Sequence, residues 1–168
     1  MKENPPVRKH PRLKGYDYSQ TGCYFVTVCT DRRKRLLSDI VVGRDDPGAP
    51  QTLLSPIGEM VERYLLEIPN HYETVDVAHY VIMPNHVHIL LMIENGAPGS
   101  SRPTLSQIIG AWKRFTNKEA GFRLWQSSYH DHVIRSEEDF LDHWTYIDGN
   151  PGRWPEDEYY TEETTFHI

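Results

Sequence analysis

Two apolar segments, residues 75–82 and 86–93, are separated by only three residues, Met83, Pro84 and Asn85. Both segments are rich in β-branched and other apolar residues, a composition typical of β-strands. Because so short a link leaves no room for a crossover helix, the two strands are predicted to form an antiparallel hairpin. The fold class then depends on which elements precede and follow this hairpin.

Three other segments carry the capping residues and the apolar spacing of amphipathic helices. They begin at Ser55–Pro56, at Thr104 and at Ser136, and the third helix is expected to run to about Asp148. The side chains expected to face inward are Ile57, Met60, Val61, Tyr64, Leu65 and Ile68 in the first helix, Leu105, Ile108, Ile109, Trp112 and Phe115 in the second, and Phe140, Leu141, Trp144 and Ile147 in the third.

Further strands are expected at residues 23–30 and 128–135, and residues 44–51 are expected to form a loop because of their Pro, Gly and Asp content. The resulting order is β-α-β-β-α-β followed by one more helix. This order predicts an α+β, ferredoxin-like antiparallel sheet with helices on one face.

The chain of 168 residues is long enough for one domain with a hydrophobic core, expected at residues 16–154. Residues 1–15 are expected to form a basic extended arm, and residues 155–168 an acidic tail. Up to Arg35 there are nine Lys or Arg against three Asp or Glu, a net charge of +6; the remainder has nine against 21, a net charge of −12. The total of −6 therefore does not exclude a polyanionic partner, since local patches steer polyanions.

No stretch is apolar and long enough to span a bilayer, and the polar, basic N-terminal residues do not resemble a secretory signal. The two cysteines, Cys23 and Cys29, form no CxxC pair. A reduced cytoplasmic location is therefore expected.

The second strand of the hairpin contains two histidines, His86 and His88, on one face. Two imidazoles at this spacing can converge on one cation, which predicts a metal site. The alternative is a pair of core histidines, each with its own buried hydrogen-bond partner. A second pair, His130 and His132, has the same spacing and is interpreted as a polar strand edge that can line the same cleft, with Tyr129 beside it.

The third helix contains Tyr146 and, one turn later, Asn150, which share a helix face apart from the apolar stripe. A tyrosine near a helix end is usually a packing or surface residue, but beside a metal it can act as a nucleophile. Asn150 lies between Gly149 and Pro151, so a simple helix C-cap is the alternative to a metal ligand.

Three segments together carry a family resemblance: "MPNHVHILL", "LWQSSYHDHVIRSEEDF" and "YIDGNPGRW". In this order and spacing they resemble the single-tyrosine HUH transposases, most closely the REP-associated tyrosine transposase branch, from about Gly15 to Trp154. The resemblance implies that His86 and His88 hold a divalent cation, Mg²⁺ or Mn²⁺, that Asn150 completes the site, and that Tyr146 is the catalytic nucleophile.

The resemblance also implies cleavage and strand transfer of single-stranded DNA, often beside a hairpin, through a covalent 5′-phosphotyrosine. Two alternatives stay open: a domesticated relative that binds hairpin DNA without cutting it, and a cupin-like metal enzyme in which the histidine pair lies in a β-barrel. Family members have shared or self-contained active sites, so both a monomer and a homodimer are compatible with the sequence.

DNA contacts are expected from two basic groups. One group follows the first strand and the other lies on the second helix: Arg32, Arg33, Lys34 and Arg35, then Lys113 and Arg114. Ordinary solvated surface is the alternative for both. Aromatic side chains that can stack on unpaired bases are Tyr16, Tyr18, Trp125 and Tyr129, with core packing favoured for Trp125. The acidic tail is expected to fold over the DNA cleft and compete with phosphate.

Overall fold

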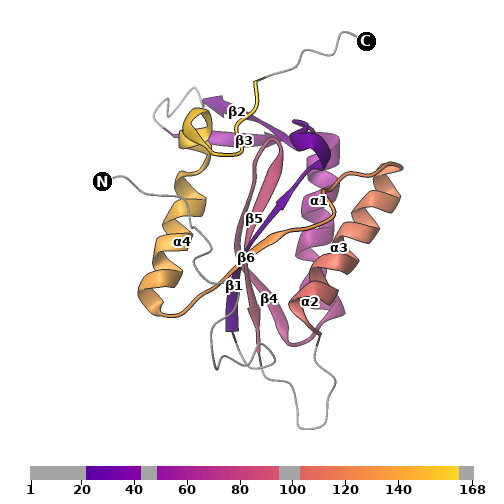
Figure 1. The fold of residues 1–168 in the computed structure, drawn as a ribbon, viewed down its shortest axis with the longest axis vertical. Helices are drawn as coiled ribbons and strands as arrows, with labels where there is room; N and C mark the ends of the chain where they lie inside the picture. Colours follow the sequence, from indigo (N-terminus) through magenta and orange to yellow (C-terminus); the bar gives the residue numbers. More distant parts are fainter. Residues whose placement is uncertain (1–21, 43–48, 95–102, 163–168) are drawn as a thin grey trace.

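The computed structural model describes residues 22–42, 49–94 and 103–162. Its central feature is an antiparallel sheet in the order β4-β5-β1-β6, shown in Figure 1. The strands are β1 (Gly22–Cys29), β4 (Val75–Ile82), β5 (His86–Ile93) and β6 (His130–Val133). The expected arm at residues 1–15, with Tyr16 and Tyr18, lies outside the described residues, as do residues 43–48, 95–102 and 163–168.

The helices cover both faces of this sheet. One face is packed by α1 (Pro56–Leu66), the short α2 (Ile68–His71) and α3 (Leu105–Ala120), and the opposite face by α4 (Glu137–Gly149) (Figure 1). Two 3-10 helices, η1 (Asp31–Arg33) and η2 (Pro151–Glu156), follow β1 and α4. The ferredoxin-like α+β prediction is confirmed, with the additional helix α4 on its own side of the sheet. A cupin-like barrel is not formed by the part of the chain that the structure describes.

The capping residues begin the helices where the sequence predicts. The Ser55 side chain accepts from the N–H of Gly58, the Ser136 side chain accepts from the N–H of Asp139, and Thr104 with Gln107 forms a complete capping box. These side chains satisfy backbone donors that the first helical turn leaves without a partner.

Each face of the sheet has its own core. Alternation along β5 directs Val87, Ile89 and Leu91 toward α1 and α3, and directs Leu90 toward α4. These four side chains are fully buried, and each contributes roughly 1.5–3 kcal/mol of burial free energy. His86 and His88 lie on the Leu90 face, so both histidines point toward α4.

Two inward-facing predictions are wrong: Leu141 and Phe115 are 53% and 46% exposed. Leu141 is on the outer side of α4, and Phe115 stacks on Tyr64 at the surface between α1 and α3. A second hairpin, β2 (Ser38–Val42) with β3 (Pro50–Leu54), was not predicted. Its strands are five residues each and only Ser38 among them is buried, so neither carries a strong apolar alternation.

Gly58 allows the first turn of α1 to lie against the backbone of Leu37. A Cβ at this position would overlap the main-chain oxygen of Leu37, which also accepts a 2.9 Å hydrogen bond from the N–H of Ser55. The close approach therefore requires a residue without a side chain.

Gly58→Ala is expected to lower the free energy of unfolding by about 1–3 kcal/mol, because backbone atoms must move apart. The matched control is Gly110→Ala in α3, where an added Cβ meets no atom of the described residues within 4 Å. That change should raise stability by about 0.5–1 kcal/mol. Urea denaturation measures both values, and equal stability of the two variants would contradict the close contact.

Candidate metal centre and nucleophile

His86 and His88 are buried side by side beneath α4. Their side chains are 0% and 1% exposed, and the ring centroids are 4.6 Å apart. His86 Nδ1–H donates to Asn85 Oδ1 at 2.8 Å, and His88 Nδ1 shares a 2.8 Å hydrogen bond with Thr27 Oγ1. The Nε2 atoms of both rings are buried and have no hydrogen-bond partner among the residues that the structure describes.

Burial keeps both imidazoles neutral. Removal from water lowers the pKa of His86 to about 3, against a smaller opposing effect of the neighbouring Asn150 side chain. Burial and the adjacent His86 also lower the pKa of His88 well below its usual value. At neutral pH the ring nitrogens are therefore free of the extra proton that would prevent metal binding.

Asn150 brings an oxygen to the same place from the end of α4. The residue is the C-cap of this helix and keeps helical backbone angles, with φ −61° and ψ −43°. Its Nδ2–H donates to Asp157 Oδ2 at 2.8 Å, while its Oδ1 is buried without a hydrogen-bond partner in the described part of the chain. Asn150 is therefore the helix C-cap and also presents this Oδ1 as a candidate metal ligand, so the two interpretations are compatible.

Asp157 is the site residue that the sequence analysis missed. Its Oδ2 lies 3.7 Å from His86 Nε2, and its side chain is 1% exposed. His86, His88 and Asp157 each offer a ligand atom within 4.8 Å of the others. Buried polar atoms without partners cost roughly 1–3 kcal/mol each, and two nitrogens with oxygens from Asn150 and Asp157 are a donor set that divalent cations accept. The residues therefore fit a metal ion.

Tyr146 lies against this cluster. Its ring centroid is 5.3 Å from that of His88 and 6.0 Å from that of Phe25, so it faces the sheet together with the apolar side of α4. The predicted separation of Tyr146 from the apolar stripe is thus wrong, because the stripe and the site share one face of the helix. Burial and the nearby carboxylates of Asp157 and Glu158 raise the pKa of Tyr146. The Arg153 guanidinium lies 5.6 Å from the Tyr146 ring centroid.

The segment after α4 covers the histidines. Tyr159 is 9% exposed, and its ring centroid is 4.6 Å from that of His86. Its main-chain oxygen accepts from Asn85 Nδ2 at 2.7 Å, and its N–H donates to Asp157 Oδ1 at 2.8 Å. The boundary expected between Trp154 and Pro155 falls inside η2, and the tail as far as Thr161 continues over the site.

The two basic groups lie in different places. Arg33 is 5.3 Å from the Tyr159 ring centroid and donates to the main-chain oxygen of Glu158 at 3.4 Å, and Arg35 is 5.6 Å from the Trp154 ring centroid. Arg32 in η1 and Lys34 at its C-cap are exposed and alternate with Arg33 and Arg35 along the chain. This basic group therefore lies beside the histidine site.

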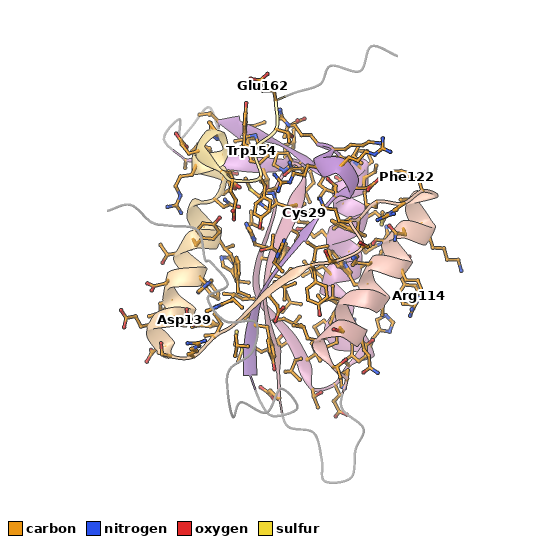
Figure 2. The ribbon with its side chains drawn as sticks, in the orientation of Figure 1. Cys29, Arg114, Phe122, Asp139, Trp154 and Glu162 are labelled. Carbon is orange, nitrogen blue, oxygen red and sulfur yellow. The ribbon has the colours of Figure 1, made fainter. Side chains whose placement is uncertain are left out.

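The structure does not bring Lys113 and Arg114 to this site. Both are on α3, across the sheet from α4, and Figure 2 shows Arg114 on the opposite side of the molecule from Asp139. Lys113 Nζ donates to the main-chain oxygen of Gln126 at 2.6 Å. Trp125 is 1% exposed and packs against Trp112 in the core, as expected.

The remaining predicted cleft residues separate from one another. Tyr129 shares a 2.8 Å hydrogen bond with Ser106 on the α3 side, and His130 is exposed. His132 lies on the α4 side with Asp139 and His143, where the three form a second cluster. Phe25 lies between the two clusters, with ring centroids 5.0 Å from His88 and 4.7 Å from His143.

Thr27 and Asn85, which orient the two imidazoles, were also missed. Asn85 directly precedes His86, so the sequence alone could have suggested that its side chain binds the imidazole. Thr27 is opposite His88 only through the register of β1 against β5, which the sequence does not reveal. Nothing in the sequence distinguishes Asp157 from the other carboxylates of the acidic tail.

In the described residues, no helix combines the length and the apolar character needed to cross a bilayer.

No model of a known protein family matches the chain. An uncharacterized protein of Haemophilus influenzae (strain ATCC 51907 / DSM 11121 / KW20 / Rd) is 30% identical over an alignment of 178 positions, which covers 92% of this chain and 94% of that relative. A second protein of the same organism, named "Putative REP-associated tyrosine transposase", is 27% identical over 146 residues, covering 80% of this chain and 73% of the relative.

Among solved structures, one described as a REP-associated tyrosine transposase bound to a REP hairpin has the same fold, with a TM-score of 0.62 at 20% identity. The match covers 86% of this chain and 74% of the other. The chain is therefore similar in sequence to a protein named as a REP-associated tyrosine transposase, and it shares the fold of a solved transposase of that kind.

Proposed function

We propose that the protein cleaves single-stranded DNA beside a hairpin and transfers the cut strand through a covalent 5′-phosphotyrosine on Tyr146. His86, His88 and Asn150 would hold a divalent cation, Mg²⁺ or Mn²⁺, with the Asp157 carboxylate beside them. The proposal rests on three buried atoms that can bind a metal ion and that have no hydrogen-bond partner in the described chain: His86 Nε2, His88 Nε2 and Asn150 Oδ1. Tyr146 lies next to them, against His88.

The chemistry requires an activated tyrosine and a stabilised phosphate. A bound divalent cation would polarise the scissile phosphate and neutralise its developing charge. Tyr146 would lose its proton and attack phosphorus through Oη; the bond from phosphorus to the 3′-oxygen breaks, and that oxygen leaves as a 3′-hydroxyl after taking up a proton. The 5′-phosphate stays on Tyr146. Attack by the 3′-hydroxyl of another strand reverses these steps and completes transfer without ATP.

The elevated pKa of Tyr146 supports a need for cations at this site. Buried beside Asp157 and Glu158, the phenol strongly favours its protonated form. The Arg153 guanidinium over the ring and a cation on the histidines are the positive charges available to oppose this. The tyrosine is therefore expected to react only when the metal and a phosphate are both in place.

DNA recognition is assigned to the η1 side of the site. Arg32 and Lys34 are exposed there, next to the Arg33 and Arg35 side chains that pack on Tyr159 and Trp154. Arg32 and Arg33 both have φ of 54°, a backbone conformation uncommon for residues other than glycine, which turns the chain sharply after β1. Such a turn can present several cations to a phosphate backbone.

Tyr146→Phe is expected to reduce formation of a covalent protein–DNA adduct at least about a thousandfold, since the attacking oxygen is absent. The adduct is measured on a denaturing gel with labelled single-stranded hairpin DNA and Mn²⁺. Tyr64→Phe, on the other side of the sheet, is the matched control and should keep the wild-type rate. Adduct formation by the Tyr146 variant would refute the assignment. Tight hairpin binding by a wild-type protein that forms no adduct would instead favour a non-cutting DNA binder.

Asn150→Ala is expected to weaken Mn²⁺ affinity by about ten- to a hundredfold and to slow cleavage, because one ligand oxygen is lost. Higher Mn²⁺ concentration should restore part of the rate. Asn150→Asp keeps an oxygen at this position and should retain more activity than alanine. Calorimetry and cleavage rates at a series of Mn²⁺ concentrations measure both effects; unchanged values for alanine would mean that Asn150 is only a helix cap.

Glu158→Gln combined with Glu162→Gln should strengthen hairpin binding at low salt by roughly two- to tenfold, with a smaller effect as added salt screens the charges. Both side chains are exposed near the site, so neutral replacements leave the packing of Tyr159 intact. Glu59→Gln with Glu67→Gln, exposed on the α1 side, is the charge-matched control. Equal effects of the two pairs in a fluorescence-anisotropy titration would show that only the total charge matters.

A further inference from the structure

A second histidine–carboxylate cluster links β6 to α4. His132 Nε2 lies 2.9 Å and 3.2 Å from the two carboxylate oxygens of Asp139, and His143 Nδ1 lies 3.1 Å from Asp139 Oδ1. The ring centroids of the two histidines are 4.8 Å apart. The Asp139 carboxylate thus lies between two imidazoles, and Figure 2 shows this residue near the start of α4.

Hydrogen bonds to main-chain groups orient the members of the cluster as they do in metal sites. His143 Nδ1 lies 2.7 Å from the main-chain oxygen of Asp139, which can only accept, so Nδ1 carries the proton and Nε2 carries the lone pair. The Arg135 N–H donates to Asp139 Oδ2 at 2.9 Å. An imidazole held by a backbone carbonyl through one nitrogen is the usual arrangement of a metal-ligating histidine.

The lone pair of His143 Nε2 accepts no hydrogen bond from the described part of the chain. This Nε2 is buried, and the whole side chain is only 8% exposed. A purely structural ion pair would require only the nitrogens that face Asp139. A bound cation that accepts this electron pair would account for a buried Nε2 without a hydrogen-bond partner.

We propose that His132, Asp139 and His143 bind a Zn²⁺ ion at a site separate from the His86–His88 centre. Two imidazole nitrogens and one carboxylate oxygen are ligands that Zn²⁺ accepts, with a water molecule as the fourth. Each of the three residues offers one nitrogen or oxygen atom within 4.8 Å of those of the other two, and a zinc tetrahedron with bonds of about 2.0–2.1 Å has edges of about 3.3 Å. His132 and Asp139 are each about one-fifth exposed, so an ion can reach the site from solvent.

The site would act on the position of the nucleophile helix. His132 is on the edge strand β6, whereas Asp139 and His143 occupy the first turns of α4, which also carries Tyr146. A zinc ion coordinated by all three would crosslink the strand to the helix. The same sheet face would then hold a reactive cation at one end and a structural cation at the other, with Phe25 between them.

The test uses the full chain, stripped of metal with a chelator, in the His86→Ala, His88→Ala background that removes the first site. We expect one equivalent of Zn²⁺ to bind by calorimetry and to raise Tm. In that background, His132→Ala and Asp139→Asn should each lower the affinity at least tenfold and abolish the Tm shift. His130→Ala, an exposed histidine on the same strand, is the matched control and should change neither value.

Removal of both buried histidines could unfold the protein, so the same substitutions are also made in the otherwise wild-type chain. There the Zn²⁺ stoichiometry should fall by one equivalent with His132→Ala or Asp139→Asn, and stay unchanged with His130→Ala. With Co²⁺ as the probe, the lost equivalent should be the one with the intense visible absorption of four-coordinate geometry. Zinc binding by the Asp139→Asn variant with the affinity of the His130→Ala control would overturn the proposal.

Discussion

The register of β1 against β5 is the constraint on which the rest of the site depends. This pairing places Thr27 opposite His88 and Cys29 opposite His86, at one end of the two central strands of the sheet. Thr27 then orients one imidazole, while Asn85, at the start of β5, orients the other. A shift of one residue would turn both histidines to the α1–α3 face, because side chains alternate along a strand. The strand pairing and these two hydrogen bonds thus orient both imidazoles.

The other half of the site comes from the chain after β6. Helix α4 brings Tyr146 and Asn150 to the histidine face, and η2 then turns the chain so that Asp157 and Tyr159 return over His86. The site is consequently closed, with both histidines almost fully buried. The segment around Tyr159, which covers His86, is held by hydrogen bonds to Asn85 and Asp157 and by the nearby Arg33.

Neutral imidazole nitrogens and carboxylate oxygens lie together on the α4 face of the sheet. The buried His86 and His88 are uncharged, whereas Asp157 lies beside them and opposes ionisation of Tyr146. A cation at this point would complement the carboxylate and reduce its effect on the tyrosine. The acidic overall composition is therefore compatible with a DNA partner, since the basic residues of η1 and the candidate metal centre lie together.

The sequence alone determined the types and order of the main elements, the helix starts at Ser55, Thr104 and Ser136, and the common face of His86 and His88. These features depend on capping and on the two-residue and 3.6-residue periods, which are local properties of the chain. Only the tertiary structure decided that Asp157 and Tyr159 cover the histidines, that Lys113 and Arg114 lie across the sheet, and that His132 meets Asp139 and His143. Those contacts depend on strand register and on how α4 packs, and no local pattern distinguishes one tail carboxylate or one surface cation from another.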